Sequence, residues 1–161
     1  MNNNRLKLEF RDGTWDTVKK IAYKDVGSSN TFYKVDRQNI ISSADGVGFN
    51  VRYFECGAHG FTTLEKHEHV HIVMIARGEG RVIIGNVVFE ARPNDYFVIP
   101  SWAPHQLINA GAEPFAFFCS VNAVRDKFVL LTGDEIDALK QNEGIQTWIK
   151  IPDGYFNSDT Q

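Results

Sequence analysis

One short stretch of the chain reads Glu65-Lys66-His67-Glu68-His69-Val70-His71 and holds three of its five histidines. Glu65, His67, His69 and His71 alternate with other residues, so in an extended strand they would project to one face. Burying such a face without partners is costly, because each unpaired polar group loses its hydration. Neutral imidazole, however, is a common protein ligand for transition metals. The stretch therefore favours a metal site over a solvated polar surface.

A second segment, from Pro93 to Asn109, supports the first. Here a predicted strand leads into a turn bounded by Pro100 and Pro104, and a histidine, His105, opens the next strand. In an antiparallel sheet this next strand can lie beside the first histidine strand. We therefore expect His105 to reach the same site.

These two segments resemble the two signature motifs of the cupin family. The second family motif is Pro-x-Gly, two residues, His, three residues and Asn. The stretch from Pro100 to Asn109 matches it in spacing, with Trp102 in place of the glycine. Asn94 stands where the family often has a glycine, and asparagine tolerates the left-handed conformation that a glycine would take. The resemblance covers residues 47–121 and implies a small barrel that holds one divalent metal ion.

The first motif departs from the family pattern, which is His-x-His, a spacer and Glu. Counting back from Gly78, the glycine that ends the motif, gives Glu-x-His, three residues and His instead. The resemblance then implies four ligands: Glu65, His67, His71 and His105. A rival alignment uses His67 and His69, with His71 in the glutamate position, so His69 is the alternative ligand. The ion is one of Fe, Mn, Ni, Cu or Zn, and its identity stays open.

Short β-type runs alternate with Gly, Pro, Asn and Asp in residues 47–122. The predicted strands are Phe49–Cys56, Thr62–His67, Ile72–Arg77, Arg81–Ile84, Val87–Glu90, Asp95–Ile99, His105–Asn109 and Phe115–Val121. The pair Gly85-Asn86 between two of these runs predicts a hairpin. Many short strands separated by turns favour a sandwich or closed barrel. The resemblance narrows this to an all-β double-stranded β-helix, the cupin jelly-roll barrel.

We expect one domain over residues 1–161, with N-terminal strands in 1–46, the cupin core in 47–122 and a short helical extension in 123–161. Thr132-Gly133-Asp134-Glu135 has the spacing of a capping box and predicts the start of a helix. Cys56 and Cys119 lie in apolar runs and are predicted to be buried free thiols.

Charge and hydropathy limit the partners. The net charge of −3 argues against a nucleic-acid or membrane-surface partner, since both need concentrated positive charge. The chain starts with a polar segment, and no run approaches the roughly 18 apolar residues of a membrane span. We therefore expect a cytoplasmic protein. The cupin resemblance implies a small-molecule ligand in the barrel and a second copy in a homodimer.

Several residues are candidates for the pocket wall. Phe115, Phe117 and Cys119 share one face of the last predicted strand, and by the resemblance that strand lines the pocket. Gln106 and Trp102 flank the second motif and are expected at the mouth of the barrel.

The expected function is that of an enzyme on a small oxygenated metabolite. Four protein ligands leave up to two open positions on an octahedral ion, where the metal acts as a Lewis acid. The reaction is that of a dioxygenase or of an isomerase or lyase, and for the latter the candidate base is Glu65 or His69. The alternatives are a small-molecule-binding or sensing protein without turnover, and a barrel that its metal merely stabilises.

Overall fold

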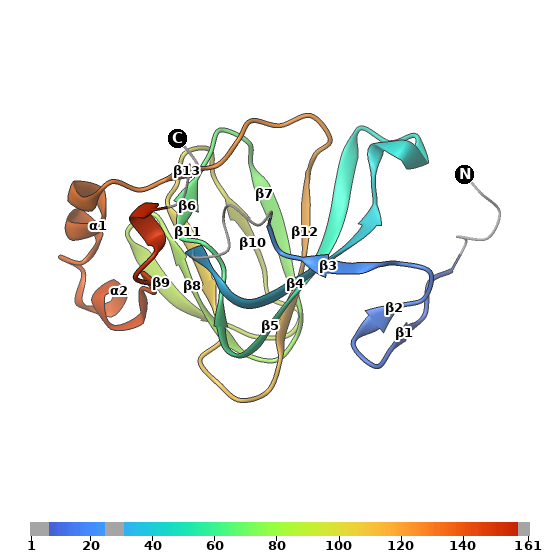
Figure 1. Cartoon of the computed structure of the whole chain (residues 1–161), viewed down its shortest axis with the longest axis horizontal. Coiled ribbons are helices and arrows are strands. Elements are labelled where there is room, and N and C mark those ends of the chain that lie inside the picture. Colours follow the sequence, from blue (N-terminus) through green and yellow to red (C-terminus); the bar gives the residue numbers. More distant parts are fainter. Residues whose placement is uncertain (1–6, 25–30, 158–161) are drawn as a thin grey trace.

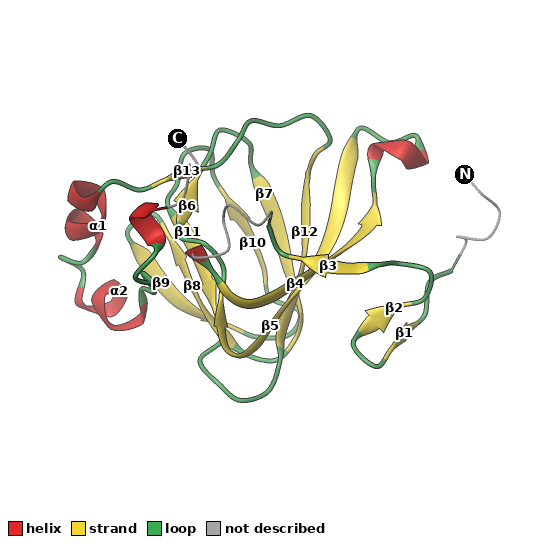
Figure 2. Ribbon diagram, in the orientation of Figure 1, coloured by secondary structure: helices red, strands yellow, loops and turns green. Residues whose placement is uncertain are grey.

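The strands and helices are described by a computed structural model that covers residues 7–24 and 31–157 (Figures 1 and 2). Parts of the predicted N-terminal and C-terminal segments, at 1–6, 25–30 and 158–161, lie outside the described residues. The strands are β1 (Phe10–Arg11), β2 (Thr14–Trp15), β3 (Lys20–Ala22), β4 (Tyr33–Ile41), β5 (Phe49–Phe61), β6 (Glu65–Lys66), β7 (His71–Arg77), β8 (Gly80–Ile84), β9 (Val87–Ala91), β10 (Tyr96–Ile99), β11 (His105–Ile108), β12 (Phe115–Asn122) and β13 (Val129–Leu130). The helices are η3 (Ser43–Asp45), α1 (Gly133–Leu139), α2 (Glu143–Trp148) and η4 (Tyr155–Asn157).

The main sheet curls around an interior, as Figure 1 shows. Its strands follow the order β10-β7-β12-β5-β11-β6-β13; β4 pairs with β5 and β3, and β8 pairs with β11 and β9. The long strand β5 pairs with β12 and β4 along its first part, and its last residue Phe61 pairs with Ile108 of β11. Because β5 serves both groups of strands, it joins the two sides of the curl. This is the mainly antiparallel β architecture with terminal helices that the sequence predicts.

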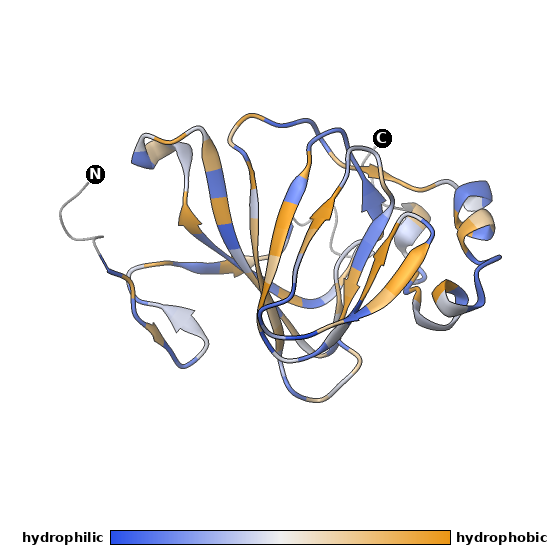
Figure 3. Ribbon diagram, turned by 180° about the vertical axis from the view of Figure 1, so that it is seen from behind, coloured by the Kyte–Doolittle hydropathy of each residue, from blue (hydrophilic) through white to orange (hydrophobic). Residues whose placement is uncertain are grey.

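Alternation along the strands decides which side chains enter the interior. Strand β7 buries His71, Val73 and Ile75 and exposes Ile72 and Met74. Figure 3 shows bands of apolar and polar residues along several strands of the sheet. The interior cluster includes Phe54, Val73, Ile75, Val82, Leu107, Phe115, Phe117 and Cys119. Each fully buried large apolar side chain favours folding by about 1.5–3 kcal/mol, so this cluster is the main source of stability.

Three tight turns adopt the backbone geometry that their residues predict. Ile84 pairs with Val87, so Gly85 and the next residue form a two-residue hairpin loop, with Gly85 at φ +57°. Asn94 has φ +74°, the left-handed conformation expected of a glycine substitute. Trp102, in the glycine position of the second motif, has φ +59° and donates its backbone N–H to the carbonyl of His67 at 2.7 Å. This hydrogen bond connects the turn of the second motif to His67 in the first motif.

The C-terminal helices cover one outer side of the sheet, next to β9 (Figure 2). The predicted capping box is confirmed, because Thr132 and Glu135 cap the start of α1 reciprocally. A second apolar cluster fills the space between sheet and helices, and it includes Leu64, Ile83, Ile108, Leu131, Ile136, Ile145 and Tyr155. Strand β11 is consequently buried on both faces. Among the described residues, no helix has the length and apolarity that crossing a membrane requires.

The histidine stretch is not one extended strand, so its four alternating residues do not share a strand face. The strand predicted at Thr62–His67 contracts to β6 (Glu65–Lys66), and the chain bends at Glu68 and His69 before β7 starts at His71. The bend exists because Asp126 holds the backbone amides of Glu68 and His69, at 2.7 and 3.0 Å. The alternation of side chains along one strand therefore does not explain why the histidines lie close together.

The outer face of β7 and β10 is apolar. Ile72 pairs with Val98 and Met74 with Tyr96, and all four side chains are exposed. The expected homodimer stays a prediction.

Candidate metal centre

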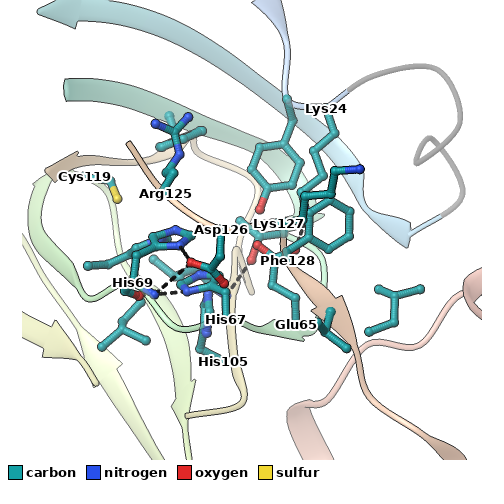
Figure 4. A pocket seen from close by; sticks show the side chains of 18 of the residues that line it. Lys24, Glu65, His67, His69, His105, Cys119, Arg125, Asp126, Lys127 and Phe128 are labelled. Atoms are coloured by element: carbon teal, nitrogen blue, oxygen red, sulfur yellow. Dashed lines mark hydrogen bonds and ion pairs between the residues drawn. The ribbon is translucent and has the colours of Figure 1, made fainter. Parts of the chain in front are cut away.

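Four histidines and one glutamate meet at one end of the curled sheet, although they come from three separate elements. Glu65 on β6 is the register partner of His105 at the start of β11. His71 opens β7, and His67 and His69 lie in the bend between β6 and β7. Figure 4 shows His67, His69 and His105 gathered beside the carboxylate of Asp126. The fold thus supplies the convergence that alternation along one strand does not.

The ligand atoms form two overlapping groups. Candidate ligand atoms of Glu65, His67 and His105 lie within 4.8 Å of one another, and so do those of His67, His69 and His71. The ring centroid of His67 is 4.8 Å from that of His105 and 4.4 Å from that of His71. His67 is therefore the common member, and the structure brings together all five residues that the sequence analysis names.

Hydrogen bonds set which nitrogen of each ring is available. Nδ1 of His67 lies 2.8 Å from the carbonyl of His69, and Nδ1 of His105 lies 2.9 Å from the carbonyl of Ala103. A carbonyl only accepts, so each Nδ1 carries the proton and each Nε2 keeps its lone pair. This is how metal-binding imidazoles are usually oriented.

Two histidine nitrogens at this centre have no hydrogen-bond partner among the described residues. They are the Nε2 atoms of His67 and His71, and both are buried. An unpartnered buried polar atom is costly, and it calls for a ligand. A metal ion bound to these lone pairs satisfies them, so the donor set fits a divalent metal.

The imidazoles of His67, His71 and His105 are neutral at physiological pH. Burial, together with neighbouring His105 and His69, lowers the pKa of His67 to about 4. Burial lowers the pKa of His71 far below its usual value, and the nearby His105 and Arg52 add to this effect. The pKa of His105 is also lowered, chiefly by burial. Metals bind the neutral ring, so the site needs no deprotonation step near neutral pH.

The two residues that compete for the fourth position each have another partner. Glu65 forms an ion pair with Lys24, whose ammonium group also lies 3.2 Å from the ring centroid of Phe128. Nδ1 of His69 donates to Asp126, and the ring stacks on His67 with centroids 3.6 Å apart. Either residue can offer its remaining atom to a metal, and the choice between Glu65 and His69 stays open.

The site opens into a cavity of about 970 Å³. Its apolar wall includes Phe54, Val73, Ile99, Leu107 and Phe117, and its polar wall includes Lys24, Arg37, Arg52, Arg125, Asp126 and Lys127. Of these charged residues, Lys24, Arg37, Arg125 and Asp126 were not identified from the sequence. Single charged residues in loops and outer strands form no pattern that would have drawn attention to them.

Three of the expected pocket residues lie elsewhere. Phe117 and Cys119 line the cavity, but Phe115 is buried in the interior cluster below it. Gln106 faces the helices, where its amide bonds to the backbone of Thr62 and Lys150, because it alternates with inward-facing His105 on β11. Trp102 is about half exposed, at 51%, on the turn before β11, and it does not line the cavity.

Comparison with known proteins establishes the family. Residues 53–121 match a family model described as a cupin domain. A curated relative, 1-methylthio-D-xylulose 5-phosphate methylsulfurylase of Rhodospirillum rubrum, is 38% identical over 135 residues, which cover 84% of this chain and 85% of the relative. The chain belongs to the cupin family.

Solved cupin structures share the architecture of this cupin. A cupin 2 conserved barrel domain protein from Rhodopseudomonas palustris superposes with a TM-score of 0.79 at 34% identity, over 88% of this chain and 96% of that one. A cupin-2 domain protein from Rhodospirillum rubrum gives a TM-score of 0.77 at 34% identity, over 93% of both chains. These similarities confirm the predicted jelly-roll barrel. The family and the histidine cluster together support a centre that can hold a metal ion.

Proposed function

We propose that this cupin is a metal-dependent enzyme that acts on a methylthio-substituted keto-sugar phosphate. The observation that carries the proposal is the pair of buried, unpartnered Nε2 atoms of His67 and His71 at the cavity. The substrate class comes from the curated relative, whose name specifies 1-methylthio-D-xylulose 5-phosphate and which aligns with 84% of this chain. A cavity of about 970 Å³ has ample room for a phosphorylated pentulose.

The proposed ligands are His67, His71 and His105, with Glu65 or His69 in the fourth position. A bound divalent ion would supply Lewis acidity toward the ketone and hydroxyl oxygens of the substrate. The protein contributes imidazoles that are already neutral and already oriented by the carbonyls of His69 and Ala103. No rearrangement of these rings is needed before the metal binds.

The residue that moves a proton is the member of the Glu65 and His69 pair that does not bind the metal. A carbon next to a ketone loses its proton to a base within hydrogen-bond reach, and both residues line the cavity. Asp126 holds Nδ1 of His69 at 2.5 Å, which leaves Nε2 as the atom that would take and return the proton. This assignment favours proton transfer beside a carbonyl over dioxygenase chemistry.

The apolar part of the cavity suits the thioether. Phe54, Phe117 and Val73 line it, and a methylthio group has no hydrogen-bonding demand that these side chains would leave unmet. The same surface excludes water from the reacting carbon, which strengthens the electrostatic effects of the charged residues around it.

The test is turnover of synthetic 1-methylthio-D-xylulose 5-phosphate by protein loaded separately with Fe, Mn, Ni, Cu or Zn. A small thiol is added as acceptor, so that the methylthio group can leave as a mixed disulfide while the sugar carbon gains hydrogen. Proton NMR should show loss of the thioether methyl signal with at least one metal. His59→Asn, which changes an exposed histidine of β5 outside the cluster, should retain the activity. A substrate that binds and stays unchanged with every metal would instead indicate a binding or sensing protein.

A further inference from the structure

The cavity carries a second group of charged side chains, separate from the histidines. Arg37 lies on β4, Arg52 on β5 and Arg125 in the segment after β12, and all three line the cavity. Arg37 is the register partner of Phe54, and Arg52 lies two residues before Phe54 on the same face of β5. Residues in such diagonal positions are within reach of one another when their side chains are long. Three guanidinium groups therefore share one wall.

The acidic residues of the cavity do not neutralise Arg52 or Arg125. Of the described lining residues, Glu65 and Asp126 are the two carboxylates; Glu65 pairs with Lys24 and Asp126 with His69. Burial lowers the pKa of Arg125, and the positive charges of Arg52 and Arg37 lower it further. Arg52 and Arg125 therefore leave a surplus of positive charge on this wall that an anion would relieve.

Arg52 is held in position while part of its hydrogen-bonding capacity is unused. Its guanidinium lies over the ring of Phe54, at 5.1 Å from the centroid, and donates to the sulfur of Cys119 at 3.3 Å. Its buried Nε has no hydrogen-bond partner among the described residues. Arg125 donates to the carbonyl of Asn122 at 3.4 Å, a long bond that a stronger acceptor can replace. Both residues are thus available to an anionic ligand.

We propose that Arg52 and Arg125, supported by the positive charge of Arg37, form the subsite for the phosphate group of the substrate. The inference rests on the proposed function, because that function places the other end of the same molecule at the histidines. Guanidinium groups bind phosphate oxygens through paired, charge-assisted hydrogen bonds. A dianionic phosphate also matches two or three clustered cations better than a single carboxylate does.

The sheet register sets a suitable distance between the two ends. Arg52 on β5 pairs with Cys119 on β12, which pairs with Val73 on β7, and His71 lies two residues from Val73 on the same buried face. Arg52 and Val73 are thus about two strand spacings apart, or about 10 Å, and His71 lies two residues before Val73 on β7. Figure 4 shows Arg125 and Cys119 on the opposite side of the cavity from Glu65. A phosphorylated five-carbon chain can extend between the two groups.

Calorimetric binding of D-xylulose 5-phosphate and of D-xylulose to the metal-loaded protein tests the subsite without requiring turnover. We expect the phosphorylated sugar to bind at least about 10-fold more tightly than D-xylulose. Arg52→Gln and Arg125→Gln should each weaken its binding by about 10- to 100-fold and leave D-xylulose binding unchanged. Arg52→Lys should fall in between, because it keeps the charge but loses the planar fork. Arg92→Gln, which changes an exposed arginine paired with Glu90, is the matched control.

Metal content and far-UV circular dichroism check that each variant is folded. Arg125 lies in an exposed segment, so Arg125→Gln provides the test even if Arg52→Gln does not fold. An equal preference for the phosphorylated sugar in wild type and in Arg125→Gln overturns the subsite. Turnover of the methylthio substrate with unchanged KM in Arg125→Gln also overturns it, while the proposed function stands. The converse outcome is that D-xylulose 5-phosphate binds in an arginine-dependent way while the methylthio substrate is not turned over with any metal. That result supports the subsite and refutes the proposed function.

Discussion

Nδ1 of His69 lies 2.5 Å from a carboxylate oxygen of Asp126, 57 positions further along the chain. The same carboxylate accepts the backbone N–H groups of Glu68 and His69. Burial opposes ionisation of Asp126, but these three donors outweigh it and keep the pKa of the carboxyl group well below its usual value. The hydrogen bonds of Asp126 therefore connect the segment after β12 to the histidine bend. The preceding residue of this segment, Arg125, lines the cavity.

Asp126→Ala should impair the centre although Asp126 is not one of the proposed ligands. The variant frees the His69 ring and two backbone amides, so the bend at Glu68 loses its support. We expect metal affinity or turnover to fall about 10- to 100-fold, as is typical when a residue that orients a metal-binding histidine is lost. Metal titration and steady-state kinetics measure the two effects separately. Asp134→Ala, at the exposed start of α1, is the control, and wild-type values for both proteins would refute the role of Asp126.

Gly78→Ala should destabilise the fold strongly. Gly78 has φ +69°, and a Cβ atom there would lie 2.1 Å from the carbonyl oxygen of Pro114, a backbone atom that cannot move aside. We expect the free energy of unfolding in urea to fall by about 2–4 kcal/mol. Gly46→Ala is a matched control, because Gly46 has φ +84° with nothing within 4 Å of its Cβ position, and it should lose only about 1–2 kcal/mol. Equal losses would show that the contact with Pro114 does not matter.

The sequence predicted the strands and turns well, because their signals are local. The spacing of the second motif placed Trp102 and Asn94 in glycine positions, and both adopt positive φ. The two-residue loop at Gly85 and the cap at Thr132 likewise depend on a few neighbouring residues. Local steric and hydrogen-bonding rules decide such features, so they can be read without knowledge of the rest of the fold.

The parts of the site that the sequence missed depend on contacts between distant segments. Asp126 and Lys24 act on the histidine cluster from positions that carry no local pattern. The expectation for Gln106 is wrong for a related reason. Its side chain lies on the outer face of β11, and no local pattern predicts that the C-terminal segment covers that face. Long-range packing, rather than local propensity, decides which polar side chains reach a cavity.

The ligand set can be separated residue by residue. His67→Ala and His105→Ala should each lose most of the bound metal, since each removes an oriented imidazole from a buried site. Glu65→Ala should lose metal only if Glu65 is the fourth ligand, and His69→Ala only if His69 is. Elemental analysis of protein purified without chelator gives the answer directly. His59→Asn, outside the cluster, should keep full metal content, and full retention in His67→Ala would contradict the proposed centre.

The metal-free protein should become less stable as the pH falls from about 6.5 to about 4. The pKa of His67 is about 4 in the folded protein, and the pKa values of His71 and His105 are also lowered. In the unfolded chain all three titrate near pH 6.5. Above that pH neither state gains protons at these rings. Below it the unfolded state binds protons that the folded state refuses, so the free energy of unfolding falls.

Urea unfolding of metal-free protein at pH 7.5, 6.5 and 5.5 measures this slope before carboxyl groups begin to titrate strongly. His71→Gln removes one of the three imidazoles whose pKa is lowered in the folded protein. The stability of this variant should therefore depend less steeply on pH than that of the wild type. His59→Asn, which replaces an exposed histidine of β5 outside the cluster, is the matched control. An identical slope in His71→Gln and wild type would mean that His71 is protonated in the folded protein. It would then be unavailable as a metal ligand below neutral pH.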